Sequence, residues 1–336
     1  MLERYFLGAN SGEGFFSLYG QFPGEGLYLH VIKGGPGSGK SSLMNRIAEG
    51  AESRGYAVQR LLCSGDPQSL DGIAIPGLGQ AWCDGTAPHV MEPGIFGVNG
   101  DYVDLSRFFR GPLSRKDSKE LQELNKAYKE QYKLAYAALH RAEKDAGDRV
   151  AKLEPEQEQE LRSAVEGLLE RHEPIACPLG NRPERVFLSA ISCDGMIWLR
   201  ESLCGGAEHI YSLERESGIG RAALEAALRI ARERGERPVE VADPLSPGCM
   251  NAVILPERSL VLADGCWELD RGEELSLMAM PAAEIRSAPE GWLDKGLEHL
   301  AAAKLLHDRL ESVYRPYMDI PALEAFTQEQ LKRIFA

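Results

Sequence analysis

Residues 34–42 read Gly-Gly-Pro-Gly-Ser-Gly-Lys-Ser-Ser and fit the pattern G-x-x-x-x-G-K-[S/T] without a mismatch. Glycines at these places let the backbone curl into a nest whose N–H groups point at phosphate oxygens. In this pattern Lys40 can reach the β- and γ-phosphates of a nucleotide, and the Ser41 hydroxyl can bind Mg²⁺. We therefore predict a phosphate-binding loop made of Gly34, Gly35, Pro36, Gly37, Ser38, Gly39, Lys40, Ser41 and Ser42.

The sequence on either side of this loop has the context that such a loop requires. Residues 27–32 are apolar and β-prone, which predicts a buried strand. Residues 40–53 carry apolar side chains at helical spacing and predict a helix that stops at Arg54 and Gly55. The N-terminus of that helix adds the positive end of its dipole to the loop. The alternative interpretation is a glycine-rich turn that matches the pattern by chance.

Composition narrows the class of protein. A chain of 336 residues predicts two domains, or one domain with large appendages. The formal charge of −13 argues against non-specific binding to nucleic acid or to an anionic membrane. The sequence has no secretory signal pattern and no apolar run long enough to span a bilayer. Its seven cysteines are scattered, so we expect a cytoplasmic protein with reduced thiols and no zinc site.

The chain also resembles itself. Residues 4–9 match residues 185–190 at an offset of 185 − 4 = 181, and at that offset Lys40 meets Arg221. Further along, Asp84 meets Asp264 at an offset of 264 − 84 = 180. A nearly constant offset indicates two homologous halves. We predict an α/β fold with two tandem P-loop NTPase-type domains, each a parallel sheet flanked by helices, and with helical insertions.

The second half lacks the residues that make the first loop useful. Arg215 stands in place of the first glycine, Arg221 in place of the lysine and Ala222 in place of the metal-binding hydroxyl. Glu214 and Glu216 add negative charge where a polyphosphate would lie. We predict a degenerate half that does not hydrolyse nucleotide; the alternative is that it still binds nucleotide through Arg221.

Two polar residues follow the strand predicted at 78–83. Asp84 ends this strand, where a Walker B aspartate lies, and with Ser41 it is the predicted magnesium ligand. His89 can orient an attacking water or an acceptor hydroxyl, and with Lys40 and Asp84 it completes the predicted catalytic set. The alternatives are a turn or helix-capping aspartate and an ordinary loop histidine.

Weaker candidates surround this set. Asp66, Ser69 and Asp71 follow the strand predicted at 56–62, where acceptor groups bind in small P-loop kinases, but they also fit plain turn chemistry. The arginines considered as an arginine finger, or as reaching the site from the second half, are Arg107, Arg110, Arg115, Arg182 and Arg185. Arginines are common on surfaces, so the pattern alone does not select one.

Helical patterns divide the chain further. Apolar residues recur every three or four positions from 121 to 153, Pro155 breaks this pattern, and a second helix follows from Glu156 to His172. The predicted organisation is a P-loop domain at 1–112, an inserted helical hairpin at 113–175, the degenerate domain at 176–290 and a C-terminal helical appendage at 291–336. The hairpin can serve as a lid or a partner surface, or be purely structural. Residues 15–19 predict one more short helix.

At these residues the chain resembles a bacterial cytoplasmic family of tandem P-loop proteins that are ATPase-like or nucleotide-kinase-like. The matching stretches are residues 31–42, 69–72, 84–89 and 307–311, with Tyr314, Met318 and Asp319. The resemblance covers most of the chain and implies ATP binding. In such proteins the second half tends to carry its own P-loop, and Arg215, Arg221 and Ala222 depart from that pattern.

The prediction is therefore a protein that binds ATP with Mg²⁺ and performs hydrolysis or phosphoryl transfer in its first half. ATP is preferred to GTP by default, since the only N-K-x-D-like stretch, at 125–128, lacks the aspartate. Two alternatives remain: a small-molecule or nucleotide kinase, and a nucleotide-gated binding module with little turnover. The expected partners are a nucleotide and, through the helical insertions, another protein, with no membrane and no nucleic acid.

Overall fold

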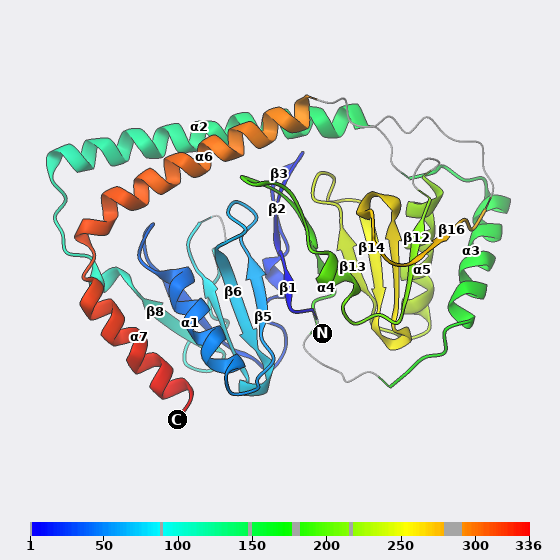
Figure 1. The fold of residues 1–336 in the computed structure, drawn as a ribbon, viewed down its shortest axis with the longest axis horizontal. Coiled ribbons are helices and arrows are strands. Elements are labelled where there is room, and N and C mark those ends of the chain that lie inside the picture. The colour runs from blue at the N-terminus through cyan, green and yellow to red at the C-terminus, as the bar shows by residue number, and fades with distance from the viewer. Residues whose placement is uncertain (1, 88–89, 147–149, 177–181, 215–217, 279–290) are drawn as a thin grey trace.

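The computed structural model describes residues 2–87, 90–146, 150–176, 182–214, 218–278 and 291–336. It is an α/β protein with two similar six-stranded sheets, set side by side and flanked by helices (Figure 1). Two long helices run across the top of the molecule in that view. None of the helices in the described ranges is both long and apolar enough to cross a bilayer.

The first sheet has the strand order β1-β5-β6-β7-β4-β8. Five strands run parallel, whereas β6 is antiparallel to both of its neighbours, so the sheet is mixed and not purely parallel as predicted. The short turn between β5 and β6 explains the reversal, because a parallel crossover needs a dozen or more residues. The strands are β1 (Arg4–Tyr5), β5 (Gln59–Leu62), β6 (Leu70–Ile75), β7 (Gln80–Asp84), β4 (Tyr28–Lys33) and β8 (Gly100–Asp104).

The second sheet repeats this plan in the order β9-β13-β14-β15-β12-β16, with β14 as the reversed strand. The element bounds keep the sequence offset: β13 begins at Val239 and β5 at Gln59, and 239 − 59 = 180. The repeat predicted from the sequence is therefore present in the fold. The strands are β9 (Arg185–Val186), β13 (Val239–Ala242), β14 (Met250–Leu255), β15 (Leu260–Asp264), β12 (His209–Leu213) and β16 (Glu273–Leu275).

A hairpin precedes the main strands of each half. Residues 15–19 do not form the predicted helix: β2 (Gly8–Ser11) turns into β3 (Gly14–Ser17). Gly14 has a φ of +97°, and the Ser11 hydroxyl donates to its carbonyl oxygen at 2.7 Å, so the turn reverses the chain before a helix can start. The second half repeats the hairpin with β10 (Ser189–Ser192) and β11 (Gly195–Trp198).

The helices flank the sheets. One helix of each half packs on the reversed strand of its own sheet, α1 on β6 and α5 on β14. The α-helices are α1 (Lys40–Glu52), α2 (Arg115–Ala146), α3 (Pro155–Glu170), α4 (Arg200–Cys204), α5 (Ile219–Glu233), α6 (Trp292–Tyr314) and α7 (Ile320–Ile334). The 3₁₀ turns are η1 (Tyr19–Gln21), η2 (Pro76–Leu78), η3 (Ser106–Phe108), η4 (Pro256–Arg258), η5 (Gly265–Trp267) and η6 (Arg315–Tyr317).

The helices predicted as a hairpin have other partners. Instead of pairing with α3, α2 lies antiparallel along α6, so that Glu120 pairs with Arg309 at 2.5 Å near one end of the contact. Helix α3 packs on α5 of the second half, where Arg162 pairs with Glu233 at 2.6 Å. Apolar residues of α2 and α3 face these different partners, which sequence periodicity alone does not reveal.

A buried hydrophobic cluster spans the two halves. It includes Tyr5 and Leu61 of the first sheet together with Val186 and Val241 of the second. The edge strands β1 and β9 join the halves, because Phe6 and Phe187, the residues that follow them, form an antiparallel bridge. The predicted boundaries between domains therefore do not separate independent hydrophobic cores.

Candidate functional site

The glycine-rich loop joins the C-terminal end of β4 to α1. Strand β4 pairs in parallel with β7 on one side and with the edge strand β8 on the other, so the loop follows an inner strand of the sheet. Gly37 and Gly39 have φ of +70° and +86°, a region that residues with a Cβ rarely adopt. A Cβ at Gly34 would lie 2.4 Å from the Oγ of Ser38. The backbone itself thus needs the glycines of the pattern.

Lys40 begins α1 and turns its side chain back over the loop. Its Nζ donates to the carbonyl oxygens of Gly34 at 2.9 Å and Gly35 at 3.2 Å. The same Nζ lies 3.6 Å from Oδ2 of Asp84, and both side chains are largely buried. The structure therefore brings together the two residues that the sequence predicts to act on one phosphate and its metal.

Asp84 and Ser41 supply the oxygens that the predicted magnesium site requires. Asp84 lies in register with Ile32 of β4, and its Oδ1 accepts from the N–H and hydroxyl of Thr86 at 2.8 and 2.6 Å. The Oγ of Ser41 accepts the N–H of Leu70 at 3.0 Å. A carboxylate and a hydroxyl are ligand types that Mg²⁺ prefers, so the chemistry of each side chain suits the ion.

A side chain that the sequence analysis did not assign to this site reaches the loop from α6. The backbone N–H of Gly37 donates to Oε1 of Glu311 at 3.0 Å, across 274 residues of sequence. A Cβ at Gly37 would lie 3.4 Å from both the Cβ and the carbonyl oxygen of Glu311, so the helix itself rests on the loop. The only earlier signal was the family resemblance at residues 307–311, because local patterns do not report such distant contacts.

Glu311 belongs to a small cluster with His307 and Asp308. Their potential ligand atoms lie within 4.8 Å of one another, the one such cluster of three or more found in the described ranges. Lys304 also pairs with Asp308, at 2.5 Å, and with Asp66 at 3.5 Å. Because Asp308 and Glu311 already have partners, this cluster is better described as an ion-pair network that ties α6 to the loop after β5.

The weaker candidates are mostly engaged elsewhere. Asp71 lies on β6, where its Oδ2 accepts the hydroxyl of Tyr19 at 2.6 Å in a buried setting. Burial and this carboxylate raise the pKa of Tyr19 well above its ordinary value. Asp66 accepts the Ser69 hydroxyl at 3.0 Å, as in a turn. The prediction for His89 lies outside the described residues.

The candidate arginines also have partners away from the loop. Arg107 stacks on Phe108 and Phe326, and Arg110 pairs with Asp319 at 2.5 Å. In the second half, Arg182 pairs with Glu257 at 3.0 Å and Arg185 with Glu240 at 2.6 Å, while Arg115 begins α2. None of the contacts found for these five side chains within the described ranges joins them to residues 34–42.

Arg221 occupies the place of the lysine in the second half, but it faces inward. Its Nε donates to Asp264 and its terminal nitrogen to Asp243, both at 2.7 Å, and only 5% of the residue is exposed. Asp264 corresponds to Asp84, whereas Asp243 stands where the first half has Cys63. Two carboxylates therefore hold the guanidinium, a pairing that the sequence analysis missed because it did not consider Asp243 and Asp264 as partners of Arg221.

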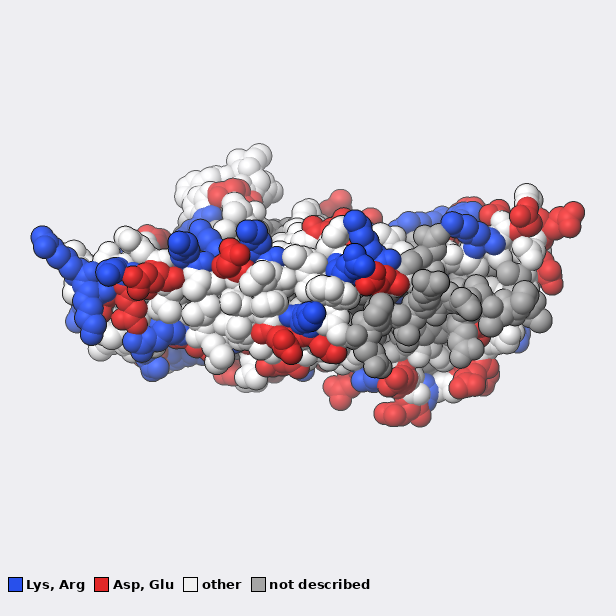
Figure 2. Space-filling view, turned by 90° about the horizontal axis from the view of Figure 1, so that it is seen from above, with Lys and Arg blue, Asp and Glu red and all other residues white. Residues whose placement is uncertain are grey.

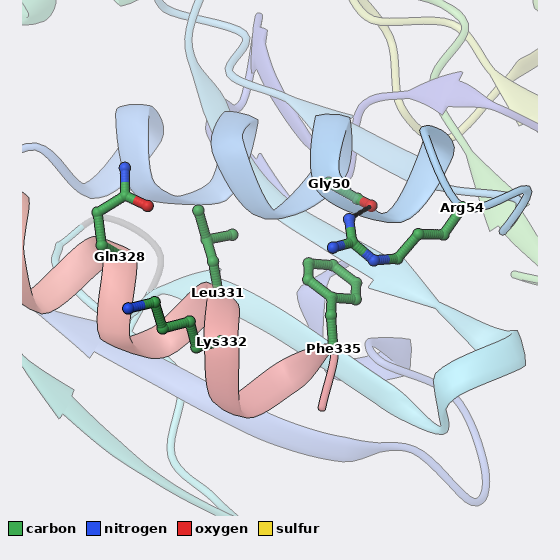
Figure 3. A pocket seen from close by; sticks show the side chains of 6 residues that line it. All are labelled: Gly50, Arg54, Gln328, Leu331, Lys332 and Phe335. Atoms are coloured by element: carbon green, nitrogen blue, oxygen red, sulfur yellow. Dashed lines mark hydrogen bonds between the residues drawn. The ribbon is translucent and has the colours of Figure 1, made fainter.

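The other surfaces considered give weaker indications of a ligand site than the glycine-rich loop does. A pocket lies between α1 and α7 (Figure 3), where Arg54 donates to the carbonyl oxygen of Gly50 and stacks on Phe335. It lies at the far end of α1 from the loop. The face seen in Figure 2 mixes basic and acidic side chains, with no continuous basic surface among the residues drawn in colour.

Comparisons of the chain with protein-family models, with curated proteins and with solved structures find no match. A function must therefore be argued from the loop and its neighbours.

Proposed function

We propose that residues 34–42 bind the phosphates of ATP with Mg²⁺ and that the first half hydrolyses ATP or transfers its γ-phosphoryl group. The observation that carries this proposal is the contact of the loop with the carboxylate of Glu311. The Gly37 N–H donates to a carboxylate oxygen at 3.0 Å, as a nest of backbone donors does with an anionic oxygen. This contact supports the interpretation of the first half as a P-loop-type domain.

Each residue has a distinct part in this proposal. Lys40, held over the loop by two carbonyl oxygens, moves from them to the β- and γ-phosphates. Asp84 and Ser41 hold the metal ion, which when bound neutralises charge on the phosphate oxygens. His89 keeps its predicted part in orienting the attacking water or hydroxyl. Catalysis would rest on positioning and charge neutralisation.

The second half would not take part in turnover. The guanidinium of Arg221 is buried between two carboxylates, and Ala222 offers no hydroxyl for a metal. Phosphate oxygens would have to displace Asp243 and Asp264 from the arginine. We infer that Arg221 holds the second half together instead of binding nucleotide.

A gated binding module is the second candidate. The observation that favours it is the contact of α6 with the loop, because such a contact links nucleotide binding to helix position. The kinase alternative has less support, because Asp66 and Asp71 are engaged with Ser69, Lys304 and Tyr19.

Calorimetry with Mg-ATP, with phosphate release followed in parallel, tests the proposal. Wild type, Lys40→Ala and Arg221→Lys would be compared. One site per chain that Lys40→Ala abolishes and Arg221→Lys leaves intact is the expected result. Absence of ATP binding in every variant would refute the proposal, and two sites would refute the silent second half. Tight binding without phosphate release would favour the gated module.

A further inference from the structure

Both C-terminal helices lie against the glycine-rich loop. Glu311 of α6 accepts the Gly37 N–H at 3.0 Å. A Cβ at Gly39 would lie 3.1 Å from the Cδ2 of Leu323 of α7. Arg46 of α1 then pairs with Glu324 at 2.7 Å. Helices α6 and α7 thus both contact the loop.

The contact with Glu311 is directly competitive with phosphate binding. The donor it uses, the N–H of Gly37, is one of the backbone groups that this kind of loop directs at phosphates. A carboxylate at that donor takes up one hydrogen bond and places a negative charge where the phosphates would add more. Both anions cannot share the same N–H at hydrogen-bond distance.

We propose that Glu311 acts as an intramolecular competitor that occupies the Gly37 N–H, and that a bound polyphosphate moves α6 off the loop. This inference rests on the proposed nucleotide site and specifies its regulation. Charge-assisted hydrogen bonds to phosphate oxygens would take the place of the hydrogen bond from Gly37 to Glu311.

The helix that carries Glu311 is suited to transmit the change. Helix α6 packs along α2, and its Leu300 lies in one buried cluster with Leu139 of α2 and with Ile191 and Leu245 of the second half. Movement of α6 at Glu311 would therefore disturb its packing against the second half of the molecule. A nucleotide bound in the first half would be reported at the second.

Variants of Glu311 test the competition. Glu311→Gln keeps the shape of the side chain and removes its charge, whereas Glu311→Ala removes both charge and acceptor. Glu298→Gln is the matched control, because Glu298 is an exposed glutamate of the same helix. By calorimetry with Mg-ATP, both Glu311 variants should bind about three- to tenfold more tightly than wild type, and the control should match wild type.

The outcomes separate this inference from the proposed function. Equal or weaker affinity in both Glu311 variants, with binding that Lys40→Ala still abolishes, would overturn the competition alone. Failure of wild type and of both Glu311 variants to bind Mg-ATP would overturn the nucleotide site as well.

Hydrogen exchange tests the movement of the helix. In wild type, saturating Mg-ATP should speed amide exchange in residues 305–314, because these turns lose their contact with the loop. Added protection in this segment would contradict displacement of α6. In Glu311→Ala the same segment should exchange faster already without nucleotide.

Discussion

Phe6 and Phe187 exchange two backbone hydrogen bonds, N–H to O at 2.9 Å in one direction and 3.0 Å in the other. The two residues correspond to each other at the repeat offset of 187 − 6 = 181. A reciprocal contact between two equivalent residues is typical of an isologous interface. The halves therefore meet as the subunits of a symmetric dimer do, within one chain.

The buried pair around Arg221 makes a prediction about stability. Replacing Arg221 by Leu leaves Asp243 and Asp264 buried without their cation, so the free energy of unfolding should fall by about 3–5 kcal/mol. Arg232→Leu is the control: its contact with Glu240 is 4.0 Å long and half-exposed, so the change should stay below about 1 kcal/mol. Urea unfolding measures both. Similar losses in the two variants would contradict the structural assignment of Arg221.

Asp84 makes a prediction about turnover. Asp84→Asn should lower the rate of phosphate release at least about a hundredfold, because the metal loses a charged ligand. The control is Asp104→Asn at the end of β8, where Asp104 accepts from the N–H and hydroxyl of Ser106 just as Asp84 does from Thr86. If both variants lost activity equally, the effect would belong to the turn and not to the metal site.

Part of the fold and of the candidate site could be predicted from the sequence, and part could not. The loop, its strand and helix, and Asp84 follow from local patterns, because each depends on residues close in sequence or on a repeated spacing. The partners of α2 and α3 could not be predicted, since an apolar stripe shows that a helix is covered but not by what. The contact of Glu311 with Gly37 could not be predicted either, because the two residues are 274 positions apart in the sequence.

The contact between α2 and α6 makes a prediction about packing. A Cβ at Gly296 would lie 2.7 Å from the Cδ2 of the buried Leu139, so Gly296→Ala should cost about 1–2 kcal/mol despite the better helix propensity of alanine. Gly167→Ala in α3 has no atom within 4 Å of the new Cβ and should stabilise by about 0.4–1 kcal/mol. Thermal unfolding of the two variants would show opposite shifts. A stabilised Gly296→Ala would contradict close packing of the two helices.

Cys83 makes a prediction about pH. Burial raises its pKa from 9.0 to about 12. Between these pH values the unfolded chain releases the Cys83 proton, whereas the folded chain keeps it. The contribution of the neutral, buried thiol to the free energy of unfolding is therefore complete below pH 9 and is lost as the pH rises towards 12. In native protein at pH 8, alkylation of Cys83 should be far slower than in denatured protein, as mass spectrometry would show. Rapid alkylation of the native thiol would contradict its burial.

The return of α6 and α7 to the first half also has a consequence during synthesis. Residues 34–42 are synthesised well before α6 and α7, the helices that cover them. Until then the nascent first half displays an uncovered anion-binding loop and the apolar face of α1, on which Leu323 and Phe335 later pack. On the proposed function, a cellular nucleotide would bind the loop at this stage and would be present when α6 is made.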